Sequence, residues 1–409
     1  MATAALERRP EAPVDVSSND LYVEDRWREP FARMRAEMPL SWRAESPYGA
    51  YWSAVTHDLV TAIELDHQTW SSELGNITIQ DGVAGHEFPN FIAMDPPRHT
   101  EQRRVVSPAF NPSGMVRLTE QVRARTATLL DELPRGETFD WVEQVSIPLT
   151  MGMLCILFDM PFEERHDIKT WSDMASNVSP DTQSEEYYQR FMGEMGRMLA
   201  RFDQLMEERR ALPASDDLLS RMVHSEAMGH LTPIERIANL ALLIVGGNDT
   251  TRNSMSGLVE AFARFPGELD RLHGDASLIP NAAQEIVRWQ SPVTHMRRTA
   301  TRDTELAGQK IAAGEKIVMW YISANRDEKV FADADRFDVG RANARRHVGF
   351  GHGIHRCVGA RLAEVQLATL IEEWVARGWR VVPQGEPTRL ASPFLHGFTA
   401  MPVRIESRG

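Results

Sequence analysis

Cys357 is the residue whose surroundings point most directly to chemistry. It lies in the glycine-rich run FGHGIHRCVG (350–359), and a helix is predicted directly after it, from Ala360 to Ala376. A thiol at that place is close to unpaired backbone N–H donors and to the positive end of a helix dipole, and both favour the thiolate. The glycines let a flat, bulky group approach the backbone. Such a cysteine can be a nucleophile, a zinc ligand or an axial iron ligand, whereas an inert buried thiol is the simplest alternative.

A second unusual stretch lies inside a long predicted helix. The start at 232–235 (TPIE) has an N-cap threonine, a first-turn proline and a capping-box glutamate. No proline follows until Pro266, which predicts a helix of roughly 50 Å. After the apolar run Leu240–Val245, the two glycines of GGNDT (246–250) each cost about 1 kcal/mol in a helix interior. Such local violations are expected at functional sites, and a kinked core helix is the alternative.

One face of this helix carries candidate site residues. Leu242, Val245, Gly246 and Thr250 are spaced so that they lie on the same side of a helix. Gly246 leaves room for a ligand, and the hydroxyl of Thr250 can bond a carbonyl four residues back or a water. Asp249 is placed to transfer protons.

Two further charged pairs stand out. His99 and Arg103 follow Pro96-Pro97 at a spacing of four, so on a helix they share a face and can hold an anion together. A solvated basic patch is the alternative. Glu285 and Arg288 are spaced by three on a predicted helix, which by itself is a weak signal.

The elements that must position these residues are mainly helical. Further helices are predicted at 30–38, 56–66, 115–133, 147–158, 163–175 and 184–210, and strands at 40–42, 50–55, 293–304, 310–311, 316–321, 381–382, 388–390 and 403–405. The irregular, apolar segment 76–93 is expected to cover a ligand, with a core-packing loop as the alternative. The segment 393–395 is expected to turn into a pocket.

Composition narrows the class of protein. The chain has 409 residues and a formal net charge of −13, which argues against broad nucleic-acid binding. Two cysteines are too few for a disulfide framework and suit a reducing cytoplasm. We expect no signal peptide and no membrane span, because no sufficiently long apolar run occurs.

The cysteine run resembles the haem-thiolate signature F-G-x-G-x-H-x-C-x-G of the cytochrome P-450 monooxygenases. Four further motifs resemble that family in the same order: D-P-P-x-H-x-x-x-R from 95, G-x-D-T from 247, E-x-x-R from 285 and an arginine at 298. The resemblance covers residues 41–405. It implies a mainly α fold with a small β region, and one domain over 1–409 whose first 19 residues form a flexible arm. Haem b would lie between the long helix and the cysteine loop.

The resemblance also implies roles for individual residues. Cys357 would be the iron ligand, and the haem propionates would be bound by His99, Arg103, Arg298 and His355, with Arg297 competing with Arg298. Asp249 and Thr250 would deliver protons during oxygen activation. Leu242, Val245, Gly246 and Val293 would contact substrate. Glu285, Arg288 and Arg341 would form a folding network.

The implied reaction inserts one oxygen atom of O2 into an unactivated C–H bond of a small hydrophobic substrate. The segments 246–257, 295–300 and 319–327 look most like hydroxylases of terminal methyl groups in alkanes and fatty acids. A terpene, branched-lipid or steroid side-chain hydroxylase is the alternative.

Electrons are expected from a separate iron–sulfur ferredoxin and its reductase, and the protein is expected to act as a monomer. A positive docking face is expected from Arg103, Arg104, Arg345, Arg346 and Arg356.

Two alternatives lie outside this class. One is a zinc protein that uses His347, His352, His355 and Cys357, and the other is a non-enzymatic helical scaffold. The zinc hypothesis leaves the long helix unexplained. The scaffold hypothesis does not explain why that helix contains the stretch GGNDT (246–250).

Overall fold

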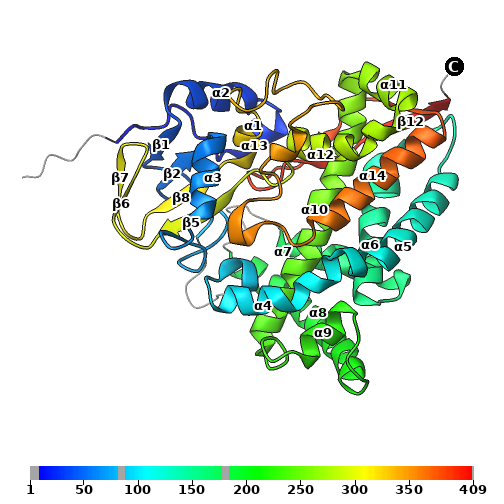
Figure 1. Ribbon diagram of the computed structural model, residues 1–409, viewed down its shortest axis with the longest axis horizontal. Helices are drawn as coiled ribbons and strands as arrows, with labels where there is room; N and C mark the ends of the chain where they lie inside the picture. Colours follow the sequence, from blue (N-terminus) through cyan, green and yellow to red (C-terminus); the bar gives the residue numbers. More distant parts are fainter. Residues whose placement is uncertain (1–8, 82–87, 177–183, 408–409) are drawn as a thin grey trace, which may run out of the picture.

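The computed structural model describes residues 9–81, 88–176 and 184–407. It is mainly helical, with α10 (Pro233–Arg264) running through the middle and a strand-rich region on one side, as predicted (Figure 1). No helix in these three ranges is long and apolar enough to cross a membrane.

The helices largely match the predicted ranges. Besides α10 they are α1 (Asn19–Val23), α2 (Arg28–Glu37), α3 (His57–Leu65), α4 (Arg98–Val106), α5 (Pro112–Asp131), α6 (Ile147–Phe158), α7 (Arg165–Ala175), α8 (Glu185–Arg210), α9 (Leu218–His224), α11 (Pro266–Gly274), α12 (Ile279–Gln290), α13 (Tyr321–Ala324) and α14 (Ala360–Ala376).

The main sheet joins strands from the N-terminal part of the chain with strands from residues 296–319. Its strand order is β1 (Leu40–Arg43), β2 (Tyr51–Ala54), β8 (Lys316–Met319), β5 (Met296–Ala300) and β3 (Trp70–Ser71). The β2–β8 pair is parallel and the other pairs are antiparallel.

The remaining strands form three small sheets. They are β4 (Thr138–Asp140) with β12 (Pro402–Ser407) and β9 (Trp379–Pro383), β6 (Thr304–Leu306) with β7 (Gln309–Ile311), and β10 (Thr388–Arg389) with β11 (Phe398–Ala400).

Two strand predictions were too long. The strand predicted from 293 begins only at Met296, because Thr294 donates its N–H to the carbonyl of Phe394 instead of joining the main sheet. The strand predicted to reach Tyr321 ends at Met319, because α13 begins at Tyr321. The Trp320 N–H, just after the strand, still donates to the carbonyl of Ala54.

The prediction of a flexible arm over residues 1–19 is wrong from Arg9 onward, and residues 1–8 lie outside the described ranges. Trp42 donates to the carbonyl of Pro10 at 2.7 Å, and Ala12 donates to the carbonyl of Trp42 at 2.8 Å. Ala12 and Val16 are buried in an apolar cluster, so burial holds this segment in place.

The long helix forms as predicted. The Thr232 hydroxyl accepts the Glu235 N–H at 3.4 Å and the Glu235 carboxylate accepts the Thr232 N–H at 2.9 Å, which completes the capping box. The helix is continuous through its glycines, and the two have different surroundings. A Cβ on Gly247 would lie 2.6 Å from Leu154 of α6, whereas a Cβ on Gly246 would meet nothing within 4 Å. Gly247 therefore permits close helix packing, and Gly246 faces open space.

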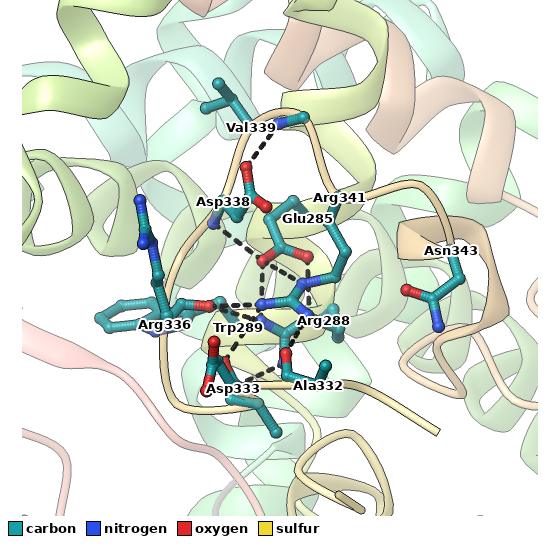
Figure 2. A network of polar contacts seen from close by, with 12 residues as sticks. Glu285, Arg288, Trp289, Ala332, Asp333, Arg336, Asp338, Val339, Arg341 and Asn343 are labelled. Atoms are coloured by element: carbon teal, nitrogen blue, oxygen red, sulfur yellow. Dashed lines mark hydrogen bonds and ion pairs between the residues drawn. The ribbon is translucent and has the colours of Figure 1, made fainter. Parts of the chain in front are cut away.

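The predicted folding network is present at the end of α12. Glu285 accepts hydrogen bonds from Arg288 and from Arg341, and Arg288 also donates to the carbonyls of Asn325, Ala334 and Arg336 (Figure 2). This network of hydrogen bonds fixes the irregular segment 325–341 against α12.

Candidate active site

A cavity lies between α10 and the loop that carries Cys357. In Figure 1 this loop is the orange segment that precedes α14, beside the green α10. Of the residues proposed from the sequence, those that line the cavity are Arg103, Leu242, Val245, Gly246, Thr250, Val293, Arg298, His355 and Cys357. Asp249 and His99 are not among the lining residues.

The cysteine loop is shaped by glycines and one backbone bond. The Cys357 N–H donates to the carbonyl of Phe350 at 2.7 Å. Gly351 and Gly353 have φ angles of 67° and 62°, which favour glycine, and a Cβ on Gly353 would lie 2.4 Å from the Glu64 carbonyl oxygen. The loop therefore packs tightly on α3. The thiol retains accessible surface that opens into the cavity.

Burial dominates the electrostatics of this thiol. It raises the pKa of Cys357, although backbone N–H groups of Gly359 and Ala360 and the charges of Arg103 and Arg356 act in the opposite direction. The N–H groups at the start of α14 thus favour the thiolate as predicted, but burial outweighs them. A metal cation facing the sulfur would supply the missing stabilisation, because metal ligation deprotonates a thiol.

The wall opposite the cysteine is the predicted face of α10. Leu242, Val245, Gly246 and Thr250 all line the cavity, so the spacing argument is confirmed. The Thr250 hydroxyl donates to the carbonyl of Gly246 at 3.3 Å, which is the predicted bond to a carbonyl four residues back. By rotating about χ1, this hydroxyl can leave that carbonyl and donate into the cavity.

Asp249 points to the other side of α10. Its carboxylate lies 2.8 Å from Arg252 Nη2 and accepts hydrogen bonds from Asn248 Nδ2 at 2.9 Å and from Ser172 Oγ of α7 at 3.4 Å. Burial raises the pKa of Asp249, and the Arg252 charge opposes that shift. The role of Asp249 in proton delivery stays a prediction.

Basic side chains gather at one end of the cavity. Arg103, Arg298 and His355 line it. Arg298 Nη1 donates to its neighbour's carbonyl at 2.8 Å, whereas Arg297 lies 2.5 Å from the Asp81 carboxylate and does not line the cavity. Of the two arginines, the structure therefore places Arg298 at the candidate anion site.

Buried histidine nitrogens without partners mark the same end. The rings of His99 and His355 have centroids 4.2 Å apart, and His355 Nε2 lies 3.0 Å from Ser72 Oγ. Within the described part of the chain, His355 Nδ1 and both His99 nitrogens have no hydrogen-bond partner. Burial lowers the pKa of His99 to about 4, and the Arg103 charge adds to the shift. Unsatisfied buried nitrogens beside two guanidinium groups fit an anionic ligand.

Sequence reasoning missed Glu64 of α3. This buried residue lines the cavity, accepts a hydrogen bond from Tyr321 Oη and lies 3.8 Å from Arg298 Nη2. Burial raises the pKa of Glu64 to about 7. Its Oε2 has no partner among the described residues. The available signal was a glutamate four residues after Val60, on the apolar face of a short helix.

These residues fit the haem group that the sequence motifs imply. The cavity offers a thiol on one side, an apolar helix face with a glycine on the other, and arginine and histidine side chains at one end for two carboxylates.

The zinc alternative is not supported. Among residues 9–81, 88–176 and 184–407 no three His, Cys, Asp or Glu side chains are grouped to hold a metal. His347 instead lies against Gln284 at 3.2 Å and accepts the N–H of Gly349.

Comparison with known proteins shows to which family the chain belongs. The cytochrome P450 family model matches residues 273–402. Linalool 8-monooxygenase of Pseudomonas putida is 35% identical, over 95% of this chain and 98% of the relative. The methyl-branched lipid omega-hydroxylase of Mycobacterium tuberculosis strain H37Rv is 36% identical, over 96% and 95%. The solved structure of cytochrome P450-153 from Novosphingobium aromaticivorans is 50% identical, with a TM-score of 0.90 over 96% of this chain and 99% of that one. The chain is therefore a member of the cytochrome P450 monooxygenase family.

Proposed function

We propose that this monooxygenase binds haem b and hydroxylates the terminal carbon of an unbranched or lightly branched hydrocarbon chain. The observation that carries the proposal is the separation of charged and apolar side chains in the cavity. The titratable residues that line it, besides Cys357, are Arg103, Arg298, His355, Glu64 and Tyr321. The first three are used by the propionates, which leaves no cation for a substrate carboxylate.

The substrate side of the cavity is apolar. Its walls come from the face of α10 and from four other segments. Apolar residues among them are Ile77, Phe91, Ile92, Leu242, Val245, Val293, Met296, Phe394 and Leu395. Such a surface gains free energy by removing hydrocarbon from water, and it cannot satisfy buried polar groups of a ligand. This favours a neutral chain, or the hydrocarbon end of a fatty acid.

The haem, once bound, supplies oxygen activation with Cys357 as the sulfur ligand of its iron. The chain's own residues would do the rest. Arg103, Arg298, His355 and His99 would neutralise and orient the propionates. Thr250 would present its hydroxyl to the reacting centre, and the apolar wall would exclude water.

Two names among the relatives support hydroxylation of a lipid-like chain, since one is a methyl-branched lipid omega-hydroxylase and another is linalool 8-monooxygenase. The second name also favours a terpene as the alternative substrate.

Haem absorbance shifts separate these candidates. Titration of the ferric protein with octane, dodecanoate, limonene and a sterol should give the tightest binding for octane, and turnover should yield the 1-alcohol. Preferred binding and oxidation of limonene would overturn the proposal in favour of a terpene substrate.

For electron supply we infer a small acidic iron–sulfur ferredoxin and its reductase. Arg104, Arg345, Arg346 and Arg356 are exposed, and none of them has an ion-pair partner in the part of the chain that the structure describes. Arg103 of the predicted docking face is half-buried and lines the cavity, so it is assigned to the propionates instead.

The docking face is tested by charge reversal. Arg104→Glu and Arg346→Glu should slow reduction by ferredoxin at low salt, and the difference should shrink as salt rises. Arg33→Glu on α2, also exposed, is the control. Reduction kinetics equal to those of wild type in both variants would contradict the docking face.

A further inference from the structure

His295 is a fully buried histidine that lies behind the cavity wall. It is not a lining residue, but its neighbours Val293 and Met296 are. Its ring contacts two loops that also contribute to the wall. Nε2 accepts the backbone N–H of Ile79 at 3.1 Å, and Nδ1 lies 3.1 Å from the carbonyl oxygen of Pro393 and 2.9 Å from Thr294 Oγ1.

The bonds to Ile79 and Pro393 define the state of the ring. A carbonyl only accepts and a backbone N–H only donates, so Nδ1 carries the proton and Nε2 is free to accept. Burial lowers the pKa of His295 to about 3, which keeps the ring neutral. The ring also packs against Trp320 and Phe394, with centroids 4.9 and 5.5 Å away. His295 is therefore held by both packing and hydrogen bonds.

Each loop continues directly into the cavity wall. Ile77 lies two residues before the Ile79 N–H, and Phe394 and Leu395 follow the Pro393 carbonyl; all three line the cavity. The imidazole spans the two loops with its opposite nitrogens. Its width therefore contributes to the distance between these two parts of the wall.

We propose that His295 is a positioning residue that sets the separation of the 77–79 and 393–395 loops and thereby the width of the cavity that admits the chain end. The inference deepens the proposed function and rests on it for the identity of that chain end. A narrow cavity favours reaction at a terminal carbon, because it keeps the adjacent carbons of the substrate away from the reacting centre.

Backbone bonds independent of His295 keep both loops attached. Arg297 donates to the carbonyl of Ile77 at 2.7 Å, and Thr294 donates to the carbonyl of Phe394 at 3.0 Å. Val293 and Leu395 form an isolated β-bridge. Variants at 295 are therefore expected to fold while the two loops lose their common spacer.

The decisive variant is His295→Phe, which keeps an aromatic ring against Trp320 and Phe394 but removes the hydrogen bonds of both ring nitrogens. His295→Gln is the rescue, because its amide oxygen can accept the Ile79 N–H again. His57→Phe is the control. Like His295, His57 is buried, and its ring packs on Phe331 while its Nε2 lies 2.9 Å from the Arg346 carbonyl oxygen. Unlike the neighbours of His295, the residues next to His57 do not line the cavity, and neither does His57 itself.

The first readout is the binding of 1-alkylimidazoles of increasing chain length to the ferric holoprotein, because an imidazole binds the haem iron whatever the natural substrate is. The quantity compared is the ratio of the dissociation constants for the weakest-binding and the tightest-binding chain lengths. We expect this ratio to be roughly 10-fold smaller in His295→Phe than in wild type. His295→Gln should recover part of the difference, and His57→Phe should match wild type. The second readout is the ratio of terminal to internal alcohols from octane, which should fall in His295→Phe.

An unchanged chain-length profile and an unchanged alcohol ratio in folded, haem-loaded His295→Phe would overturn the inference. The same would follow if His57→Phe changed the profile as much as His295→Phe. If wild type does not oxidise octane but the alkylimidazole profile still changes at 295, the proposed substrate fails while the positioning role stands.

Discussion

Arg288 and Glu285 form a two-bond ion pair from which water is excluded. Arg288 Nε and Nη2 donate to the two carboxylate oxygens of Glu285 at 2.7 Å each, and both side chains are fully buried. Arg341 Nε donates to the same carboxylate at 2.9 Å (Figure 2). One carboxylate thus pairs with two buried guanidinium groups, and this anchors the 325–341 segment on α12.

Loss of the Glu285 carboxylate should be severely destabilising, because it leaves two buried charges unpaired. We expect Glu285→Gln to lower the free energy of unfolding by about 3–5 kcal/mol, measured by urea denaturation of the holoprotein. Arg361→Ala, which removes an exposed pair with Glu364 at 3.3 Å, is the control and should cost less than about 1 kcal/mol. Equal effects of the two variants would contradict a folding role for Glu285.

The two cysteines should behave differently when replaced by alanine. Cys357→Ala removes the thiol that faces the cavity and should abolish the carbon-monoxide difference band from which the cytochrome P450 family takes its name. Cys155 is buried in α6, and burial raises the pKa of its thiol to about 11. Cys155→Ala should therefore keep the band. A retained band in Cys357→Ala would exclude this residue as the iron ligand.

Thr250 and Asp249 should affect turnover in different ways. Thr250 lines the cavity, so Thr250→Ala should reduce the alcohol formed per O2 consumed, and Thr250→Ser should restore it. Asp249 is held on the far side of α10 by Arg252 and Ser172, so Asp249→Asn should slow O2 consumption itself, by roughly 10²-fold if it supplies protons. Wild-type rates and coupling in both variants would remove both residues from proton delivery.

Substitutions of Arg298 and Arg297 should have different effects, the first on haem binding and the second on stability. Arg298→Gln removes a guanidinium from the cavity and should speed the transfer of haem to apomyoglobin. Arg297→Gln breaks the pair with Asp81 and should lower the melting temperature, with haem transfer close to wild type. Faster haem loss in Arg297→Gln than in Arg298→Gln would reverse the assignment.

Glu64 should make stability depend on pH. Its pKa rises from 4.5 to about 7 on folding because of burial, so the folded protein binds more protons than the unfolded chain between these values. The free energy of unfolding should therefore fall as the pH rises through this window, by at most about 3 kcal/mol, and remain lower above it. Glu64→Gln should flatten this dependence in urea titrations, whereas Glu101→Gln at an exposed site should not. A Glu64→Gln profile parallel to wild type would contradict the shifted pKa.

Local patterns in the sequence were enough for the main features of the site. The capping box and the apolar run predicted α10, and helical spacing put Leu242, Val245, Gly246 and Thr250 on one face, because the period of a helix is set by its backbone. The family motifs likewise identified the cysteine loop and the network around Glu285. The helix and its face depend on residues close together in the chain, whereas the contact of Glu285 with the distant Arg341 was predicted only through the family resemblance.

The rest depended on contacts between distant segments. Arg297 and Arg298 are neighbours in β5 and point to opposite faces, so only the packed sheet decides that Arg298 meets the cavity. The pKa of Cys357 follows from burial, and the link from His295 to Ile79 and Pro393 joins segments about 100 or more residues away in sequence. The sequence by itself determined which chemistry is present and on which faces of local elements it lies. The tertiary structure decided which faces meet and which charges lose water, because both depend on long-range packing.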